Sequence, residues 1–431
     1  MKYKIINFGC KVNTYESTYF EEVLIKDGYT EAKEVKDADV VVINTCSVTN
    51  VADQKCRKFI RRLKRENDKA VIIACGCSVQ NNGEEYQTYG IDILLGNHHK
   101  SKIPELYKEF LKTREPIVLI DSNRKQEFDD MLLNKFEKHT RAFIKIQDGC
   151  DNFCSYCVIP LLRGSLRSKK FETVIKEAKT LADNGHKEIV LVGIHTGSYN
   201  SDGKDLVDLI NEISKIEKVK RIRLSSIEIT ELNDKFMETL KNNKKLVSHL
   251  HIPLQAGSNE ILKLMNRKYD KKYFKDKLEL IRSIRPDINI TTDVIVGFPQ
   301  ETDELFEESM EFCKELEFGK IHVFPYSIRN NTKASLMEGH VKEEIKKKRA
   351  LQLIRISDIL QCTYEKKFLG KEMTIITEKN HQNEIVGFTD NYIKVFVRDA
   401  NFLNSNEEVI VKLDSWDEKY IYSDFIKKGE D

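Results

Sequence analysis

The sequence predicts an α/β protein in three parts: an open α/β sheet of the Rossmann or flavodoxin kind, a partial (β/α)6 barrel, and a small antiparallel β-barrel. Two observations predict this. Apolar, β-branched runs alternate with helical stretches over most of the chain, and short strands with polar turns then follow without helices. The chain has 431 residues, of which 40% are hydrophobic, which is enough for two or three cores. We place the domains at residues 1–130, 136–368 and 369–431.

Composition excludes some classes of protein and favours others. The net charge of +2 identifies no partner, no apolar run approaches the length that spans a membrane, and the N-terminal residues enter a strand-like run without resembling a signal peptide. We therefore expect a cytoplasmic protein without a membrane partner. Its ten cysteines would stay reduced in the cytosol, so metal binding or redox chemistry is favoured over disulfides.

The first domain alternates strand and helix. Strands are predicted at residues 2–9, 39–46 and 70–77, and helices at 15–28, 51–67 and 103–112. A buried parallel sheet places its binding crevice at the carboxyl ends of its strands. Cys10, Cys46 and Cys77 lie at the ends of these three strands, so they could converge in that crevice.

The middle domain repeats the alternation six times. Strands are predicted at residues 142–147, 188–195, 221–228, 249–255, 288–299 and 320–327. Six strand–helix units make an open barrel, since eight close a complete one. Polar residues gather where these strands end, on the rim that carries the chemistry of β/α barrels. They are His195, Glu228, Gln255, Asp293 and Tyr326.

The last domain consists of short strands with polar turns. They are predicted at residues 372–377, 384–389, 392–397, 408–413 and 419–424, a pattern typical of a small β-barrel that often binds RNA. Residues 371–431 nevertheless hold eight Lys and Arg against thirteen Asp and Glu. Three explanations stay open: a basic face, stacking of bases on aromatic rings, or a protein partner. A basic face would be formed by Lys371, Lys379, Lys394 and Arg398, and the aromatic rings are those of Phe388, Tyr392 and Phe396.

Three cysteines with the spacing C-x3-C-x2-C, namely Cys150, Cys154 and Cys157, follow the first barrel strand. Iron–sulfur clusters are normally held by four thiolates, so a [4Fe–4S] cluster on three cysteines keeps one iron open for a small molecule. The alternative is a zinc knuckle with a remote fourth ligand, although structural zinc sites favour sets of paired cysteines and histidines. The motif resembles that of the radical S-adenosylmethionine (SAM) enzymes, in which the open iron chelates SAM. In this resemblance Tyr156 takes the aromatic position near the adenine.

Cys10, Cys46 and Cys77 form a second trio, within "GCKVN", "NTC" and "GCSVQ". Together with "GCDNFCSYCVIPLLRG", "HLHIPLQAGSNEILKLMNRKY" and "TTDVIVGFPQETDELFEE", these motifs resemble those of the methylthiotransferases, a radical SAM family. The resemblance implies an auxiliary [4Fe–4S] cluster on the second trio, and it identifies the C-terminal barrel as an RNA-binding TRAM module. Cys75 would point the same way as Cys77 on a strand and could partly substitute for it, but Cys77 alone fits the motif.

The resemblance also implies the chemistry. An unactivated aromatic C–H becomes C–S–CH3, and the cofactors are two [4Fe–4S] clusters and SAM. An electron donor such as flavodoxin or ferredoxin and a sulfur donor would be partners. Besides Tyr156, SAM contacts are expected from the backbone at Gly193 and from side chains on the barrel rim, each of which could equally be bonded to a neighbouring loop. The rim side chains are Glu228, Gln255 and Asp293.

Known methylthiotransferases divide by substrate. "GCKVN" and "GIHTGSY" resemble the group that converts the C2–H of N6-threonylcarbamoyladenosine, at position 37 of tRNA, to C2–SCH3. The threonylcarbamoyl carboxylate calls for hydroxyls or a cation, which His195, Thr196 and Ser198 could supply. Two alternatives within the family are isopentenyladenosine-37 in tRNA and an aspartate of a ribosomal protein. A third alternative, from a different class of protein, is a non-catalytic iron–sulfur sensor that binds RNA.

Basic residues favour an RNA partner, the anticodon loop of tRNA. Residues 52–65 carry seven bases against Asp53, which predicts either a phosphate-facing surface or a solvated helix face. The bases are Lys55, Arg57, Lys58, Arg61, Arg62, Lys64 and Arg65. Four more follow the three-cysteine motif and would add positive charge near the active site: Arg163, Arg167, Lys169 and Lys170. Anticodon-loop bases are single-stranded and can be splayed into a pocket.

Overall fold

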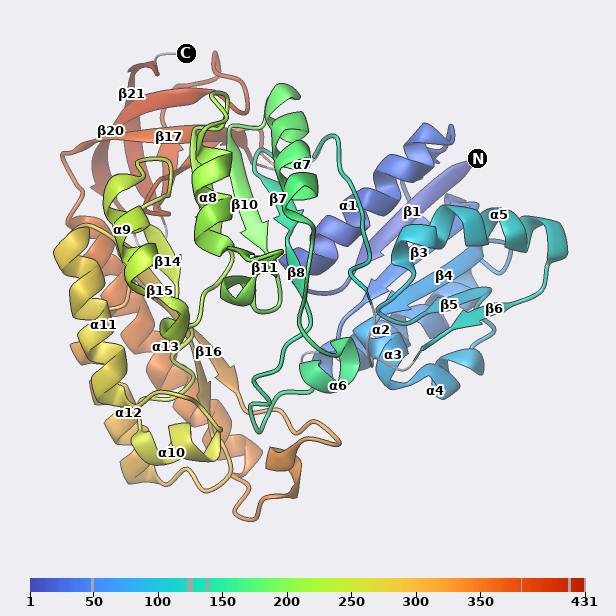
Figure 1. Ribbon diagram of the computed structural model, residues 1–431, viewed down its shortest axis with the longest axis horizontal. Helices are drawn as coiled ribbons and strands as arrows, with labels where there is room; N and C mark the ends of the chain where they lie inside the picture. Colours follow the sequence, from blue (N-terminus) through green and yellow to red (C-terminus); the bar gives the residue numbers. More distant parts are fainter. Residues whose placement is uncertain (48–49, 122–126, 137–138, 381, 418–419, 430–431) are drawn as a thin grey trace.

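The computed structural model describes residues 1–47, 50–121, 127–136, 139–380, 382–417 and 420–429 (Figure 1). A six-stranded parallel sheet forms the N-terminal domain, in the order β2-β1-β3-β4-β5-β6. This is the flavodoxin-like order, extended by one strand, and it confirms the predicted open α/β sheet. The strands are β1 (Lys2–Asn7), β2 (Thr30–Glu31), β3 (Val40–Thr45), β4 (Val71–Gly76), β5 (Ile93–Leu95) and β6 (Ile117–Leu119). The helices are α1 (Lys11–Lys26), α2 (Asn50–Glu66), α3 (Cys77–Asn81), α4 (Gly83–Gln87) and α5 (Ile103–Thr113).

Two predicted boundaries of this domain are wrong, and both lie beside cysteines. The helix predicted from residue 15 begins at Lys11, so Cys10 is its N-cap. The strand predicted to end at residue 77 ends at Gly76, where φ is +103° and a Cβ would lie 2.6 Å from the Thr45 carbonyl oxygen. Only glycine combines a positive φ with so close an approach of another carbonyl oxygen. The chain therefore turns at Gly76, and Cys77 becomes the first residue of α3.

The middle domain has the six parallel strands that the sequence predicts. They form two hydrogen-bonded triplets, β7-β10-β13 and β14-β15-β16, joined by a bridge between Ile222 and Leu246. The strands are β7 (Ala142–Lys145), β10 (Glu188–Val192), β13 (Arg221–Leu224), β14 (His249–His251), β15 (Asn289–Val296) and β16 (Lys320–Pro325). The two short antiparallel pairs are β8 (Gln147–Asp148) with β9 (Arg167–Ser168), and β11 (Asn200–Ser201) with β12 (Lys204–Asp205).

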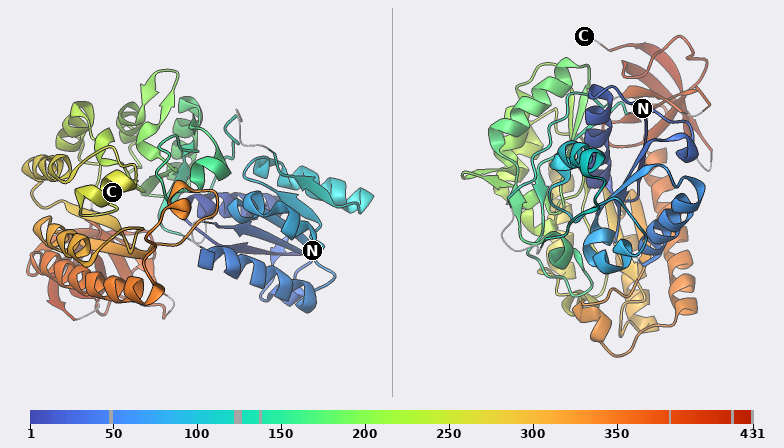
Figure 2. Two further views of the ribbon diagram at one scale, coloured as in Figure 1. Left: turned by 90° about the horizontal axis from the view of Figure 1, so that it is seen from below. Right: turned by 90° about the vertical axis from the view of Figure 1, so that its right-hand side faces the viewer.

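Helices cover the outside of this partial barrel, and the N-terminal domain lies beside its open side (Figure 2). The helices are α6 (Ile159–Arg163), α7 (Phe171–Asp183), α8 (Leu206–Ser214), α9 (Asp234–Asn242), α10 (Asn259–Leu264), α11 (Lys271–Ile284), α12 (Asp303–Glu315) and α13 (Glu343–Lys366). Among the described residues, no helix is both long and apolar enough to cross a membrane.

Five strands close the C-terminal barrel in the order β17-β18-β19-β21-β20. They are β17 (Glu372–Lys379), β18 (Ile385–Thr389), β19 (Lys394–Val397), β20 (Glu408–Trp416) and β21 (Ile421–Lys428). The small barrel is confirmed, with one correction: β19 and β21 pair in parallel, because β21 returns beside β19 only after the chain has formed β20.

This small barrel seals the amino-terminal end of the partial barrel. The Arg221 guanidinium donates to the carbonyls of Phe388 and Thr374, at 2.7 Å each. The ring of Tyr392 stacks on His249 with centroids 4.8 Å apart, and Arg223 lies 4.5 Å above the same ring. Phe388 is stacked on Tyr392 and is covered in turn by Arg141. Phe388 and Tyr392 are therefore unavailable for stacking on RNA bases, and that part of the prediction is wrong.

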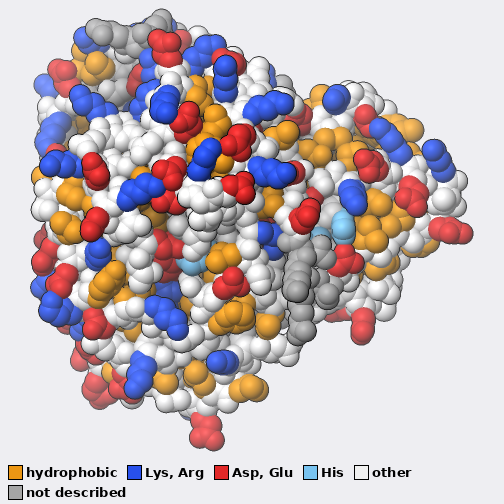
Figure 3. Space-filling model, viewed as in Figure 1, with side chains coloured by type: hydrophobic (Ala, Val, Ile, Leu, Met, Phe, Trp, Pro, Cys, Tyr) orange, Lys and Arg blue, Asp and Glu red, His pale blue; other side chains and the backbone are white. Residues whose placement is uncertain are grey.

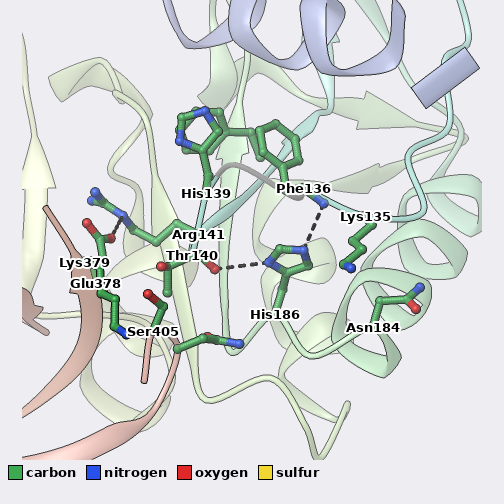
Figure 4. Close-up of a pocket in the computed structure, with 12 residues that line it drawn as sticks. Lys135, Phe136, His139, Thr140, Arg141, Asn184, His186, Glu378, Lys379 and Ser405 are labelled. Atoms are coloured by element: carbon green, nitrogen blue, oxygen red, sulfur yellow. Dashed lines mark hydrogen bonds and ion pairs between the residues drawn. The ribbon is translucent and has the colours of Figure 1, made fainter. Parts of the chain in front are cut away.

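A pocket of about 320 Å³ lies at this junction, and none of its described lining residues is a cysteine (Figure 4). The His186 imidazole clamps the segment that enters the barrel, since its Nε2 accepts from the Phe136 amide at 3.0 Å and its Nδ1 lies 3.1 Å from the Thr140 carbonyl. Burial lowers the pKa of His186, which keeps the ring neutral, as these two contacts require. We therefore interpret this pocket as part of the domain junction.

Candidate active site between two cysteine loops

The loop of Cys150, Cys154 and Cys157 is held by its backbone. The Cys150 amide donates to the Gly164 carbonyl at 3.1 Å, and the Cys157 amide donates to the Cys154 carbonyl at 3.0 Å. A Cβ on Gly149 would lie 2.0 Å from the Ser165 carbonyl oxygen, so the loop can pass here only as glycine. All three thiols are half-buried, which suits a group that must exclude water and still meet a small molecule.

Two cations lie against the thiols of this loop. The Arg267 guanidinium donates to the Cys154 sulfur at 3.3 Å and also bonds the Glu228 carboxylate. His195 Nδ1 lies 3.9 Å from the Cys150 sulfur, and its Nε2 is 2.6 Å from a carboxylate oxygen of Glu231. Burial opposes the charge of His195, but the hydrogen bonds to Cys150 and Glu231 raise its pKa to about 10. Positive charge beside sulfur stabilises thiolates and the cluster that they would hold.

The second trio lies on the N-terminal domain, at the edge that faces the barrel. Cys10 caps α1, Cys46 follows β3, and Cys77 begins α3, so the carboxyl ends of three adjacent strands carry them. The Cys77 thiol lies 3.5 Å from the Asn97 side-chain oxygen, and the Asn97 amide donates to the Leu162 carbonyl of α6 at 2.7 Å. The sheet therefore presents this trio directly to the Cys150 loop.

Cys75 does not share the direction of Cys77, contrary to the prediction. Cys75 is the last residue but one of β4 and is fully buried, with its sulfur 3.8 Å from the Asn44 side-chain oxygen. Burial raises the pKa of the Cys75 thiol to about 12. Because the turn at Gly76 ends the strand, strand alternation does not extend to Cys77, and the argument for partial substitution by Cys75 no longer holds.

The donor sets suit iron–sulfur clusters better than a single ion. In the described part of the chain, no three His, Cys, Asp or Glu side chains are gathered closely enough to hold one metal ion. A cubane cluster does not require that, because each cysteine binds a different iron. Burial raises the pKa of the Cys157 thiol to about 12, so this thiolate needs the positive charge of bound metal.

A cavity of about 240 Å³ lies beside the Cys150 loop, and Cys157 of that loop lines it. Three of the residues predicted to contact SAM line it: Tyr156, Gln255 and Asp293. Burial raises the pKa of the Tyr156 hydroxyl, which keeps the ring neutral at this apolar wall. Other lining residues come from β15, from the end of β16 and from the segment after it: Ile295, Phe324, Pro325, Tyr326, Ser327 and Arg329.

The cavity is lined by Cys157 and is linked to the second trio through two of its other lining residues. Arg329 lines it and donates to the Ser47 hydroxyl at 2.5 Å, one residue after Cys46. Val158, the neighbour of Cys157, also lines the cavity and packs with Leu162 against Cys77. A small molecule in this cavity would therefore reach the surroundings of both trios at once.

The remaining predicted SAM contacts do not line this cavity. Glu228 is bonded to Arg267, and it reaches the cysteine loop through that guanidinium. Gly193 faces Gln147, whose side-chain oxygen accepts from the amides of Ile194 and His195 at 3.0 and 2.7 Å. A Cβ at Gly193 would lie 3.1 Å from that oxygen, so glycine is favoured by packing alone. Contact of either residue with SAM stays a prediction.

The predicted substrate contacts are engaged with one another. Ser198 donates to the Glu231 carboxylate at 2.7 Å and lies 3.1 Å from His195 Nδ1. The Thr196 hydroxyl is 3.3 Å from that of Ser225. The charge of His195 is thus already balanced by Glu231, and a role of these side chains in substrate binding stays a prediction.

Buried ion pairs lock the N-terminal domain to the barrel. Glu16 of α1 binds the Lys100 ammonium at 2.6 Å and the Lys145 ammonium of β7 at 2.8 Å, and all three side chains are buried. Asp148 extends the network to Arg163, at 3.0 Å. Sequence reasoning missed Glu16, Arg267 and Arg329 because their partners come from distant segments.

Three of the four bases predicted to add positive charge near the active site are paired with carboxylates inside the protein. Arg163 and Arg167 both pair with Asp148, at 3.0 and 3.2 Å. Lys169 is fully buried and pairs with Glu177 at 2.5 Å. The prediction is wrong for these residues, because each base faces a buried carboxylate of its own domain.

Comparisons with known proteins define the class first. Residues 144–313 match the family model described as the radical SAM superfamily, and residues 2–96 match the one described as uncharacterized protein family UPF0004. Among solved structures, the radical SAM methyltransferase TsrM from Kitasatospora setae has a TM-score of 0.57 at 13% identity, covering 78% of this chain and 77% of its own. At that identity the likeness concerns the fold.

Curated relatives then define the family. The threonylcarbamoyladenosine tRNA methylthiotransferase MtaB of Bacillus subtilis is 41% identical over 90% of this chain and 88% of its own. A tRNA-2-methylthio-N(6)-dimethylallyladenosine synthase of Rickettsia conorii is 31% identical over 93% of this chain and 94% of its own. The chain belongs to the radical SAM tRNA methylthiotransferases. A zinc knuckle and a non-catalytic sensor are thereby set aside.

Arg267→Met is expected to lower the midpoint reduction potential of the cluster on Cys150, Cys154 and Cys157. The guanidinium donates a hydrogen bond to a cluster-ligating sulfur and so stabilises the more negative, reduced state of the cluster. Its loss should therefore lower the midpoint potential by on the order of 50 mV. An EPR-monitored redox titration of reconstituted protein measures the shift. The neighbouring exposed residue gives the matched control, Lys268→Met, which should leave the potential unchanged. Equal potentials in wild type and Arg267→Met would contradict the assignment.

Proposed function

We propose that this chain methylthiolates N6-threonylcarbamoyladenosine at position 37 of tRNA, replacing C2–H by C2–SCH3. The observation that carries the proposal is a cavity of about 240 Å³ that Cys157 lines. Two further lining residues, Arg329 and Val158, contact Ser47 and Cys77 of the N-terminal domain. The substrate follows from relatives: the 41% identical protein bears the name of the threonylcarbamoyladenosine enzyme, whereas the dimethylallyladenosine enzyme is 31% identical.

The cofactors of such an enzyme are two [4Fe–4S] clusters and SAM. When bound, they supply the electron, the deoxyadenosyl radical and the methylated sulfur that C–H replacement requires. We assign Cys150, Cys154 and Cys157 to the radical SAM cluster. Cys10, Cys46 and Cys77 are assigned to the auxiliary cluster.

The residues of the chain position and enclose these groups. Tyr156, Ile295 and Phe324 form an apolar wall that keeps water from a reactive intermediate. Gln255 and Asp293 offer polar groups on the same wall, suited to the ribose and the amino-acid part of SAM. Asp293 is oriented by His251, whose Nε2 lies 3.2 Å from its carboxylate.

Macromolecular partners follow from the reaction. The partners would be the anticodon loop of tRNA, an electron donor such as flavodoxin or ferredoxin, and a sulfur donor, all in the cytoplasm. The predicted basic helix is α2, where Arg57 and Arg61 pair with Glu85 at 3.4 and 3.0 Å. Lys55, Lys58 and Arg65 of α2 are exposed, so its phosphate-facing surface would be narrower than the seven bases suggest.

The C-terminal barrel keeps one aromatic face away from the domain junction. Phe396 lies 4.7 Å from Tyr420 and 5.8 Å from Tyr422, between centroids. Lys394 and Arg398 lie over these rings. On the face of the molecule that Figure 3 shows, basic and acidic side chains are interspersed. This aromatic and basic patch is the part of the module best suited to single-stranded RNA.

The modified nucleosides of total tRNA test the function. Deleting the gene should remove methylthio-threonylcarbamoyladenosine and accumulate its parent nucleoside, as measured by mass spectrometry. Restoring the wild-type gene should restore the product, whereas the Cys154→Ala gene should not. Loss of the isopentenyl counterpart would keep the reaction and change the substrate. An unchanged nucleoside profile would reject tRNA and direct attention to ribosomal proteins.

A further inference from the structure

Lys11 occupies an unusual position inside the cleft between the two large domains. It is the first residue of α1 and follows Cys10 directly, and its side chain is exposed to solvent. Its strongest electrostatic neighbours are nonetheless on other domains: Tyr392 of the C-terminal barrel, and Arg223 and Arg141 of the partial barrel. Water therefore reaches a lysine that three domains surround.

The other cations around Lys11 already have carboxylate partners. Arg223 binds Glu188 at 2.6 Å, and Arg141 is turned toward Glu378, at 3.3 Å (Figure 4). His251, further along the barrel wall, is paired with Asp293. Among the residues that the structure describes, the Lys11 ammonium has no hydrogen bond or ion pair.

Two buried nitrogens beside Lys11 also lack a hydrogen-bond partner among the described residues. They are Nη2 of Arg223 and Nδ1 of His249. The opposite nitrogen of His249 lies 3.1 Å from the Thr291 hydroxyl, so only Nδ1 is left over. Buried polar groups are rarely unsatisfied in native proteins. An anionic ligand could pair with the Lys11 ammonium and accept hydrogen bonds from these two nitrogens.

We propose that Lys11 is a specificity-determining residue that binds the carboxylate of the threonylcarbamoyl group. This inference rests on the proposed function, and it replaces the predicted cation, His195, by one that has no carboxylate partner in the described structure. An isopentenyl tail has no charge to offer, so a carboxylate contact distinguishes the two tRNA substrates. The neighbouring nitrogens of Arg223 and His249 can add hydrogen bonds to the same group.

The position of Lys11 matches the size of the substrate. The reacting C2 must come to the auxiliary cluster, which Cys10 helps to hold, and the carboxylate lies on the N6 substituent about 8 Å away. Consecutive Cα atoms are about 3.8 Å apart, and an extended lysine reaches about 6 Å further. A substrate with C2 at the auxiliary cluster therefore brings its carboxylate within reach of the Lys11 ammonium.

Binding and turnover of three anticodon stem-loops test the proposal. The first carries threonylcarbamoyladenosine, the second carries the same group with its carboxylate converted to a carboxamide, and the third carries unmodified adenosine. Reconstituted full-length enzyme should prefer the carboxylate to the carboxamide by about tenfold to a hundredfold in Kd and in kcat/KM. Lys11→Gln should lose that preference by weakening only the carboxylate RNA, and Lys11→Arg should retain it in part.

Controls separate this role from others. Lys26→Gln changes an exposed lysine at the opposite end of α1 and should keep the preference. Equal weakening of all three RNAs by Lys11→Gln would indicate a phosphate contact and overturn the proposal. Loss of iron from that variant would assign Lys11 to the cluster and also overturn it. A wild-type enzyme that modifies threonylcarbamoyl RNA and its carboxamide equally would reject the Lys11 proposal while leaving the proposed function intact.

Discussion

Cys77→Ala is expected to lose about half of the iron that the wild-type protein binds, whereas Cys75→Ala keeps it all. Cys77 begins α3 and faces the barrel, while Cys75 is buried within β4 and points into the sheet. Alanine at Cys77 removes one of three thiolates from the auxiliary cluster, and two are too few to hold it. Iron and sulfide analysis with visible absorbance measures the loss. Equal iron in the two variants would contradict the assignment of Cys77.

The products of Cys77→Ala distinguish the two clusters further. SAM cleavage to deoxyadenosine should persist, because Cys150, Cys154 and Cys157 are unchanged, but no methylthio nucleoside should form. Cys154→Ala should instead lose the radical SAM cluster and all SAM cleavage, and it should keep the iron of the auxiliary cluster. Each variant thus serves as the matched control for the other. Persistent methylthiolation in either variant would contradict the two-cluster assignment.

Glu16→Gln is expected to destabilise the contact between the N-terminal domain and the barrel by about 3–5 kcal/mol. The amide cannot balance the charges of Lys100 and Lys145, which are as deeply buried as Glu16. The urea midpoint of unfolding measures this change. The matched control, Glu109→Gln on the exposed face of α5, should stay within about 0.5 kcal/mol of wild type.

The same variant should flatten the acid limb of the stability curve. Burial opposes ionisation of Glu16, but Lys100, Lys145 and Arg163 hold its pKa well below the usual value near 4.5. A carboxyl group whose pKa is lower in the folded state than in the unfolded state stabilises the fold at pH values above its unfolded-state pKa. This stabilisation is lost as the pH falls through the folded-state pKa. The wild-type and Glu16→Gln curves should therefore approach each other below about pH 4.5. A constant difference between them down to pH 2 would contradict this assignment.

The order of elements was predictable because hydrophobic periodicity is local. The runs at 39–46 and 70–77 indicated buried parallel strands, and six similar runs indicated the open barrel, as the structure confirms. The short strands β2, β5 and β6 carry two or three residues each and leave too little pattern to be recognised. The end of β4 was missed by one residue, because a glycine with positive φ ends a strand without any change in hydrophobicity.

Site residues were predictable where they belong to a sequence motif, and they were not predictable where they contact residues far away in the sequence. The three cysteines of each trio, Tyr156, Gln255 and Asp293 belong to recognisable motifs or strand ends. The contact of Arg267 with Cys154 joins residues 113 positions apart, and that of Arg329 with Ser47 joins residues 282 positions apart. The burial of Tyr392 under Arg223 likewise depends on how two domains meet. Such contacts leave no local pattern.

Helix α1 combines two features that are usually separate. Its N-cap is Cys10, and Glu16, about 9 Å further along the same helix, anchors it to the barrel strand β7. The distance from a cluster ligand to the opposing domain is therefore fixed by a rigid rod, and no hinge lies between them. The entropic cost of bringing the two cluster sites together is met once, when the chain folds. Each turnover then begins with the groups on the two domains at a high effective concentration relative to each other.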